Sequence, residues 1–171
     1  EPPFDLVPDP RFLFLTPRQR EALSNLRYGL STSKGFTLLL GDAGTGKTTL
    51  VRAALAEMID TPSRYVLVSN PTLGRDEFVE YLAREFDLSP RARVSKTRFL
   101  LELQRDVEAR FAGGGLTGLI IDEAQSMPYE LLEEIRLLGN IETTTTKLLN
   151  ILLSGQPELA ARLNEPSLRH L

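Results

Sequence analysis

The stretch Gly41-Asp42-Ala43-Gly44-Thr45-Gly46-Lys47-Thr48-Thr49 fits the pattern G-x-x-x-x-G-K-[ST], which is typical of loops that bind phosphate groups. An apolar run at 36–40 precedes it and is predicted to be a strand. The residues from Thr48 onward predict a helix, because apolar side chains recur on one face: Leu50, Ala54, Leu55 and Met58. Glycines allow backbone N–H groups to turn toward an anion, and a helix N-terminus adds partial positive charge. The stretch therefore predicts a nucleotide site between a strand and a helix.

The residue types in this loop predict a particular division of roles. We expect all nine residues, 41–49, to form the phosphate-binding surface. Lys47 would place its ammonium group against the β- and γ-phosphates, and Thr48 would hold Mg²⁺ through its hydroxyl group. The alternative is a glycine turn that matches the pattern by chance, and the flanking strand and helix weigh against it.

Composition sets limits on the rest. The chain has 171 residues, 42% of them hydrophobic and 25% charged, which is ordinary for one soluble domain. The net charge of −3 gives the chain no overall positive charge that would favour nucleic-acid binding. There is no cysteine and only one histidine, so disulfides, thiolate metal sites and multi-histidine metal sites are excluded. No apolar run approaches the about 20 residues that cross a bilayer, and no signal peptide is visible, so we expect a cytoplasmic protein.

Strands and helices are predicted to alternate along the chain. Apolar runs at 64–69, 116–121 and 148–153 predict three further strands, each separated from the next by at least one helical segment. The runs are nearly continuous rather than alternating, as expected when both faces of a sheet are covered. The sequence therefore predicts an α/β fold in which a parallel sheet lies between two helix layers, as a single domain over 1–171.

The N-terminal segment has two interpretations. Residues 1–15 hold several prolines and large apolar side chains, among them Phe4, Phe12 and Phe14. This arm would either pack on the core or cover the adenine base of a bound nucleotide. Directly after it, Thr16-Pro17-Arg18-Gln19 predicts a helix start with a capping box. We expect that helix to end near Gly29.

Two acidic residues complete the predicted site. Asp122 and Glu123 follow the apolar strand 116–121, so their carboxylates are expected at the carboxyl edge of the sheet, where α/β folds bind ligands. Asp122 would hold Mg²⁺, mostly through water, and Glu123 would orient and polarise the water that attacks the γ-phosphate. The alternative is an acidic strand end that only begins a loop.

Polar side chains at other strand ends are weaker candidates for the same site. Ser154 and Gln156 follow the last strand and would touch the γ-phosphate or the attacking water. Asn70 follows the second strand and would hydrogen-bond Glu123, holding it inactive until a ligand arrives. Polar residues commonly end strands, so each assignment also has a purely structural alternative.

With these motifs in place, the chain resembles the AAA+ ATPases, and within them the ExeA type, the general secretion pathway protein A ATPases. The resemblance rests on six segments that extend over nearly the whole chain: PDPRFLFL, GDAGTGKTT, SNP, LIIDEAQ, RLLGNIET and LLSGQPEL. Relatives of this type include transposition regulators of the TnsC and TniB kind. The resemblance implies an αβα core with strand order 5-1-4-3-2, and ATP and Mg²⁺ as cofactors.

The resemblance also implies partners. AAA+ proteins act as rings or filaments with ATP between neighbours, so we expect self-association through the nucleotide interface. ExeA-type proteins help assemble a secretion component, which predicts secretion-system proteins as partners and places this domain on the cytoplasmic side, where it could belong to an inner-membrane protein. We expect no membrane contact from this segment itself.

The chain departs from the family in its extent. The resemblance predicts an AAA+ lid domain, with its second sensor arginine, after the core, and residues 1–171 do not include it. Arg169 is the nearest candidate for the arginine finger, and the alternative is a finger just past Leu171. Such a finger is worth about 10³–10⁵ in rate. We therefore expect an ATPase that binds nucleotide but hydrolyses it weakly in this form.

Two alternatives to the secretion ATPase stay open at this stage. One is an ATP-gated regulator that binds DNA, for which the only local support is a basic cluster, Arg91, Arg93, Lys96 and Arg98. The other is a non-enzymatic module in which nucleotide binding, rather than turnover, controls an interaction.

Overall fold

The computed structural model describes residues 15–58, 61–69 and 71–165. The elements follow the alternation that the sequence predicts. In chain order they are α1 (Pro17–Ser31), β1 (Phe36–Leu40), α2 (Lys47–Ala56), β2 (Arg64–Val68), α3 (Arg75–Glu85), α4 (Lys96–Ala112), β3 (Thr117–Ile121), η2 (Ala124–Ser126), α5 (Tyr129–Leu138), β4 (Leu149–Gly155) and α6 (Glu158–Leu163). Within these described ranges, no helix is both long enough and apolar enough to cross a membrane.

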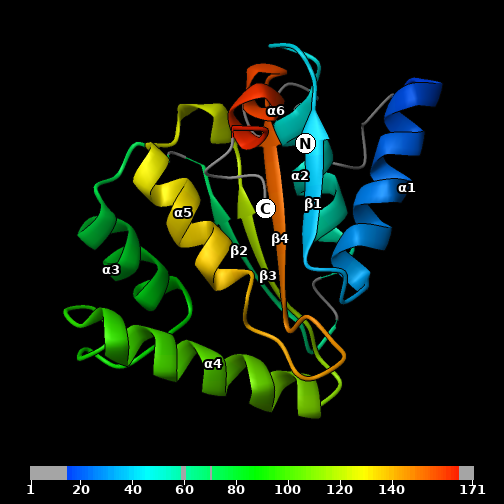
Figure 1. The fold of residues 1–171 in the computed structure, drawn as a ribbon. Helices are drawn as coiled ribbons and strands as arrows, with labels where there is room; N and C mark the ends of the chain where they lie inside the picture. Colours follow the sequence, from blue (N-terminus) through cyan, green and yellow to red (C-terminus); the bar gives the residue numbers. More distant parts are fainter. Residues whose placement is uncertain (1–14, 59–60, 70, 166–171) are drawn as a thin grey trace, which may run out of the picture.

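The four strands form one parallel sheet in the order β1-β4-β3-β2 (Figure 1). This order agrees with the 1-4-3-2 part of the predicted sheet. A fifth strand beside β1 is not among the strands of the described residues, so that part of the order stays a prediction. Because all four strands run the same way, their carboxyl ends meet at one edge, which is where α/β folds place their ligands.

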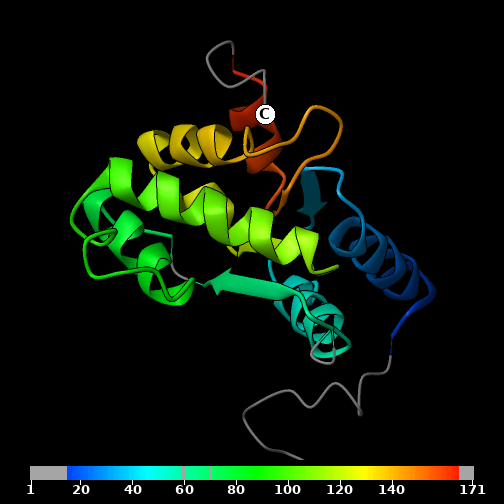
Figure 2. The same cartoon turned by 90° about the horizontal axis from the view of Figure 1, so that it is seen from below.

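The sheet separates two helix layers, as Figure 2 shows from below. One apolar cluster joins α1 and α2 to one face of the sheet, with Val51 and Ala54 fully buried. A larger cluster joins α3, α4 and α5 to the opposite face, with Phe78, Leu103 and Leu132 at 2% exposure or less. Every residue of β3 and β4 is buried, which explains their continuous apolar sequences. The predicted αβα sandwich is confirmed.

Helix α1 begins as predicted but ends later. The Thr16 hydroxyl accepts a hydrogen bond from the Gln19 N–H at 3.3 Å, and the Gln19 side chain accepts one from the Thr16 N–H at 3.0 Å, so the capping box is present. The prediction that Gly29 ends the helix is wrong, because α1 continues to Ser31. Gly29 has a packing role instead: a Cβ at this position would lie 2.5 Å from Oγ1 of Thr37 on β1.

Side chains from the sheet explain why the helix extends this far. A carbonyl in the last turn of a helix has no partner within the helix. The Leu30 carbonyl accepts hydrogen bonds from the Tyr65 hydroxyl at 3.0 Å and from Nδ2 of Asn150 at 3.3 Å. Tyr65 and Asn150 both pair with Gly118 of β3, one from each side, so the three form a row across the sheet. Tyr65 and Asn150 of this row lie 35 and 120 positions after Leu30, so the residues around the end of α1 do not indicate these contacts.

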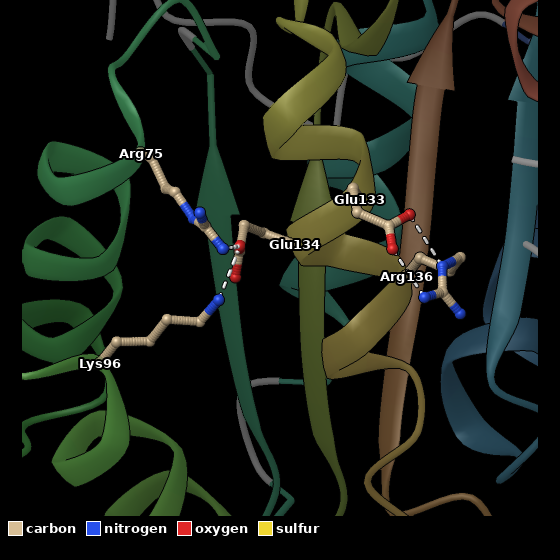
Figure 3. A network of polar contacts seen from close by, with 5 residues as sticks. All are labelled: Arg75, Lys96, Glu133, Glu134 and Arg136. Carbon is tan, nitrogen blue, oxygen red and sulfur yellow. Dashed lines mark hydrogen bonds and ion pairs between the residues drawn. The ribbon is translucent and has the colours of Figure 1, made fainter. Parts of the chain in front are cut away.

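A buried carboxylate ties together the three helices of the other layer (Figure 3). Glu134 on α5 is only 4% exposed, and it forms ion pairs with Arg75 at the start of α3 and with Lys96 at the start of α4, the latter at 2.8 Å. The neighbouring Glu133 pairs within its own helix, where the Arg136 guanidinium donates to both of its oxygens. Those hydrogen bonds lower the pKa of Glu133.

We expect Glu134→Gln to lower the free energy of unfolding by roughly 1–3 kcal/mol, since it removes charge-assisted hydrogen bonds from a buried site. This loss is smaller than for an ion pair whose remaining partner is fully buried, because the side chains of Arg75 and Lys96 are 52% and 38% exposed and can be hydrated by water. Urea denaturation measures it. Glu133→Gln is the matched control, because it changes the adjacent residue without touching another helix. Equal effects of the two substitutions would contradict the linking role of Glu134.

Candidate active site

The loop between β1 and α2 forms an open turn at the carboxyl edge of the sheet. Residues 42–45 are exposed, and the backbone takes left-handed φ values of 76° at Gly44 and 85° at Gly46, which glycine adopts at little cost. A Cβ at Gly44 would meet nothing within 4 Å, so the loop keeps free space beside its backbone. The Thr45 hydroxyl donates to the Asp42 carbonyl at 2.8 Å and closes the turn. The turn can therefore receive a ligand without side-chain obstruction.

Lys47, the first residue of α2, is buried although it carries a charge. It is 6% exposed, and its ammonium group donates to the carbonyls of Gly41 at 2.7 Å and Asp42 at 3.0 Å. An ammonium group has three hydrogens, so these contacts leave one for a further acceptor. The lysine is thus held inside the loop, as its predicted contact with phosphate requires.

Asp122 links the loop to the end of β3. Its Oδ2 accepts from the Thr48 hydroxyl at 2.5 Å, while its Oδ1 accepts from the Ser154 hydroxyl at 2.8 Å and from the Glu123 N–H at 3.1 Å. The residue is 3% exposed, and burial of a carboxylate is costly unless hydrogen bonds compensate it. The two predicted magnesium ligands, Thr48 and Asp122, therefore lie in direct contact.

Glu123 has an uncommon backbone conformation. Its φ is 54°, in the left-handed region, and it occupies the N-cap position of the short helix η2 without a capping hydrogen bond from its side chain. Non-glycine residues enter this region at a cost of about 1–2 kcal/mol, and such strain is concentrated at functional sites. The bend turns the chain sharply after Asp122 and leaves the Glu123 side chain half-buried beside it. Adjacent residues of one strand end thus present both carboxylates at one place.

The three weaker candidates have different positions. Ser154 is fully buried, and it lies within β4 rather than after the strand, as the sequence had suggested, because the strand continues to Gly155. Its hydroxyl bonds to Asp122, so a contact with phosphate stays a prediction. Gln156 lies at the same edge, where its N–H donates to Oε1 of Gln125 at 3.0 Å. Asn70 and Arg169 lie outside the described residues, as do residues 1–14 of the predicted arm 1–15.

Three residues near the site were missed from the sequence. Gln19 of the α1 capping box also donates from Nε2 to the Thr45 carbonyl at 3.2 Å, so it connects α1 to the loop. Gln125 donates to Oε2 of Glu123 at 2.6 Å. Arg162 on α6 donates to the carbonyls of Gln125 at 2.5 Å and Met127 at 2.8 Å. The capping box pointed to Gln19 only as a cap, the segment LIIDEAQ contains Gln125 without assigning it a role, and no local pattern marks Arg162.

The donor set fits a nucleotide with magnesium. Within the part of the chain that the structure describes, no three acidic or histidine side chains gather as a metal cage. Magnesium is usually held by one or two protein oxygens, with phosphate oxygens and water completing its shell. Thr48 and Asp122 supply such a pair next to a loop whose backbone can approach phosphate.

The basic cluster proposed for DNA is partly neutralised. Lys96 pairs with Glu134, and Arg98 pairs with Glu102 at 2.6 Å. Glu102 also accepts hydrogen bonds from the N–H and hydroxyl of Ser89, and these lower its pKa. A carboxyl group with a lowered pKa stays ionised and keeps its positive neighbour occupied. Two of the four cations are thus committed to structural ion pairs.

The fold and this loop-and-carboxylate geometry define a P-loop domain, and comparison with known families agrees. A family model described as an AAA domain matches residues 30–163, which is most of the chain. The chain therefore belongs to the AAA domain family, for which nucleotide binding is the shared property.

A more particular likeness is to General secretion pathway protein A of Aeromonas hydrophila. The two are 40% identical over 172 residues, which covers 100% of this chain and 31% of that protein. The resemblance to the ExeA type is thereby confirmed. The chain spans about a third of the length of this curated relative, so the match describes one part of it.

Solved structures share the fold at lower identity. Cdc6p from Pyrobaculum aerophilum has a TM-score of 0.70 and 23% identity, over 92% of this chain and 44% of that one. PCH-2 from C. elegans has a TM-score of 0.50 and 17% identity, over 92% of this chain and 42% of that one. At this identity they support the fold alone.

We expect Ser154→Ala to lower the apparent affinity for Mg²⁺ in nucleotide binding by about 10–100-fold, so that more Mg²⁺ is needed for the same binding. Loss of a group that orients a metal ligand typically has an effect of this size. The measurement is a fluorescent-nucleotide titration at a series of Mg²⁺ concentrations. Ser126→Ala, at an exposed residue of η2, is the control. An unchanged Mg²⁺ requirement in Ser154→Ala would show that its hydrogen bond to Asp122 has no part in metal binding.

Proposed function

We propose that this chain binds ATP with Mg²⁺ and hydrolyses it, as the AAA+ domain of an ExeA-type secretion ATPase. The observation that carries the proposal is the 2.5 Å hydrogen bond between Thr48 of the glycine loop and Asp122 at the tip of β3. It brings two motifs that are far apart in the sequence to one point, where a single triphosphate could reach both. The 40% identity to General secretion pathway protein A supports the particular type.

Each residue has a role that its position allows. The backbone of residues 41–46 would bind the phosphates, and Lys47 would donate its third ammonium hydrogen to a β- or γ-phosphate oxygen. Thr48 and Asp122 would hold Mg²⁺, which when bound neutralises charge on the phosphate oxygens. Glu123 would accept a hydrogen bond from the attacking water and orient it toward the γ-phosphate.

The cellular role is part of the proposal. ATP turnover would drive the assembly of a secretion component, with secretion-system proteins as partners, on the cytoplasmic side of the membrane. The name of the relative, General secretion pathway protein A, supports this class of process. No observation favours the DNA-binding alternative, because half of its basic cluster is paired with acids.

The catalytic assignment predicts that Glu123→Gln retains ATP binding but loses turnover by about 10²–10⁴-fold, the usual contribution of a general base. Lys47→Ala should lose binding itself. Phosphate release and a fluorescent-ATP titration measure the two properties. Glu130→Gln, an exposed carboxylate on α5, is the control for the charge change. Turnover in Glu123→Gln equal to that of wild type would remove Glu123 from its role, and absence of turnover in the wild type would favour a binding module.

Self-association through the nucleotide interface makes a separate prediction. In Glu123→Gln, where bound ATP would persist, ATP should raise the molar mass measured by light scattering to that of an oligomer. Lys47→Ala should stay at its nucleotide-free mass under the same conditions. A mass for Glu123→Gln that is identical with and without ATP would contradict an ATP-dependent ring or filament.

A further inference from the structure

Gln125 lies between the proposed catalytic carboxylate and the end of β4. Its Nε2 donates to Oε2 of Glu123 at 2.6 Å, and its Oε1 accepts from the Gln156 N–H at 3.0 Å. The amide group thus uses its donor on one neighbour and its acceptor on another. The amide can do both at once, whereas a carboxylate has no donor and an ammonium group has no acceptor.

The backbone of Gln125 is also held in place. Its carbonyl accepts from Arg162 of α6, which also donates to the carbonyl of Met127, the residue that follows η2. Gly155 leaves room for the side chain, since a Cβ there would lie 2.8 Å from Oε1 of Gln125. The amide therefore lies in a fitted position rather than on a free surface.

The peptide group between Gly155 and Gln156 continues this connection to the phosphate loop. Its N–H is the donor to Gln125, and its carbonyl, that of Gly155, accepts from the Gly41 N–H at 3.2 Å. Gly41 is the first residue of the glycine loop. One rigid peptide unit thus has the loop on one side and Gln125 on the other, and Gln125 in turn holds Glu123.

We propose that Gln125 is a positioning residue that orients the Glu123 carboxylate and links it, through the 155–156 peptide, to the start of the phosphate loop. This inference rests on the proposed ATP hydrolysis. Its physical basis is that one donor fixes one carboxylate oxygen and so orients the other toward a water molecule. A shift of the loop at Gly41 would move the same peptide and thereby the carboxylate.

The experiment uses two substitutions of Gln125 that separate the effect of its hydrogen bond to Glu123 from that of its hydrogen bond to Gln156. Gln125→Glu keeps an acceptor for the Gln156 N–H but removes the donor to Glu123. Gln125→Met removes both with a side chain of similar length, and it carries the test if the added charge of Gln125→Glu unfolds the protein. Gln104→Glu is the matched control, because Gln104 donates to Glu108 at 2.8 Å in the same way, on the exposed face of α4.

Both Gln125 variants should bind ATP with near wild-type affinity and lose about 10–100-fold in kcat, a part of what general-base catalysis supplies. Residues that act as a unit are non-additive, so adding Gln125→Glu to Glu123→Gln should cause no further loss. The amide hydrogen of Gln156 gives a readout independent of turnover. Its exchange should stay slow in Gln125→Glu and become faster in Gln125→Met.

Three results with the Gln125 variants would each overturn the inference: wild-type kcat in both variants, an equal loss of kcat in the Glu123→Gln background, or unchanged Gln156 exchange in Gln125→Met. Each differs from failure of the proposed function, which would appear as wild-type turnover no higher than that of Glu123→Gln. A drop in kcat for Gln104→Glu of the same size would also overturn it, since it would assign the effect to charge alone.

Discussion

The carboxylate of Asp122 accepts hydrogen bonds from Thr48, Ser154 and the Glu123 backbone, and the geometry of the site depends on these contacts. A buried charge is tolerated only where donors replace the water it has lost. Here the donors come from the first turn of α2, from β4 and from the residue that follows. The same hydrogen bonds that compensate burial also fix the distance between the glycine loop and the carboxylate edge.

The parallel sheet makes this meeting possible. β4 lies between β1 and β3, and its register places Leu40 opposite Gly155 and Ile121 opposite Leu153. The ends of three strands therefore reach the same edge, and the loop that follows β1 faces the acids that follow β3. Complete burial of β3 and β4 holds these ends rigidly, since both faces pack against helices.

Helices on both faces of the sheet and at its carboxyl edge support the site. On one face, α1 and α2 pack together, and Gln19 extends from α1 to the phosphate loop. On the other face, the ion pairs of Glu134 join α3, α4 and α5 into one layer. At the edge itself, α6 contributes Arg162, which binds the turn that contains Gln125. A network of polar contacts thus surrounds a site whose chemistry needs only a few groups.

The sequence by itself determined the fold class, the glycine loop, the acidic pair and the start of α1. Each of these features depends on adjacent residues or on the regular spacing of apolar residues within one segment. The sequence placed the end of α1 wrongly, since that end is capped by Tyr65 and Asn150 from across the sheet. It assigned no role to Gln125, although that residue ends the segment LIIDEAQ, and it gave no sign of Arg162 or of the pairing of Lys96. The contacts Gln125–Gln156, Arg162–Gln125 and Lys96–Glu134 join residues 31 to 38 positions apart. Such contacts exist only after the strands have assembled, so only the tertiary structure decided which polar groups hold the site.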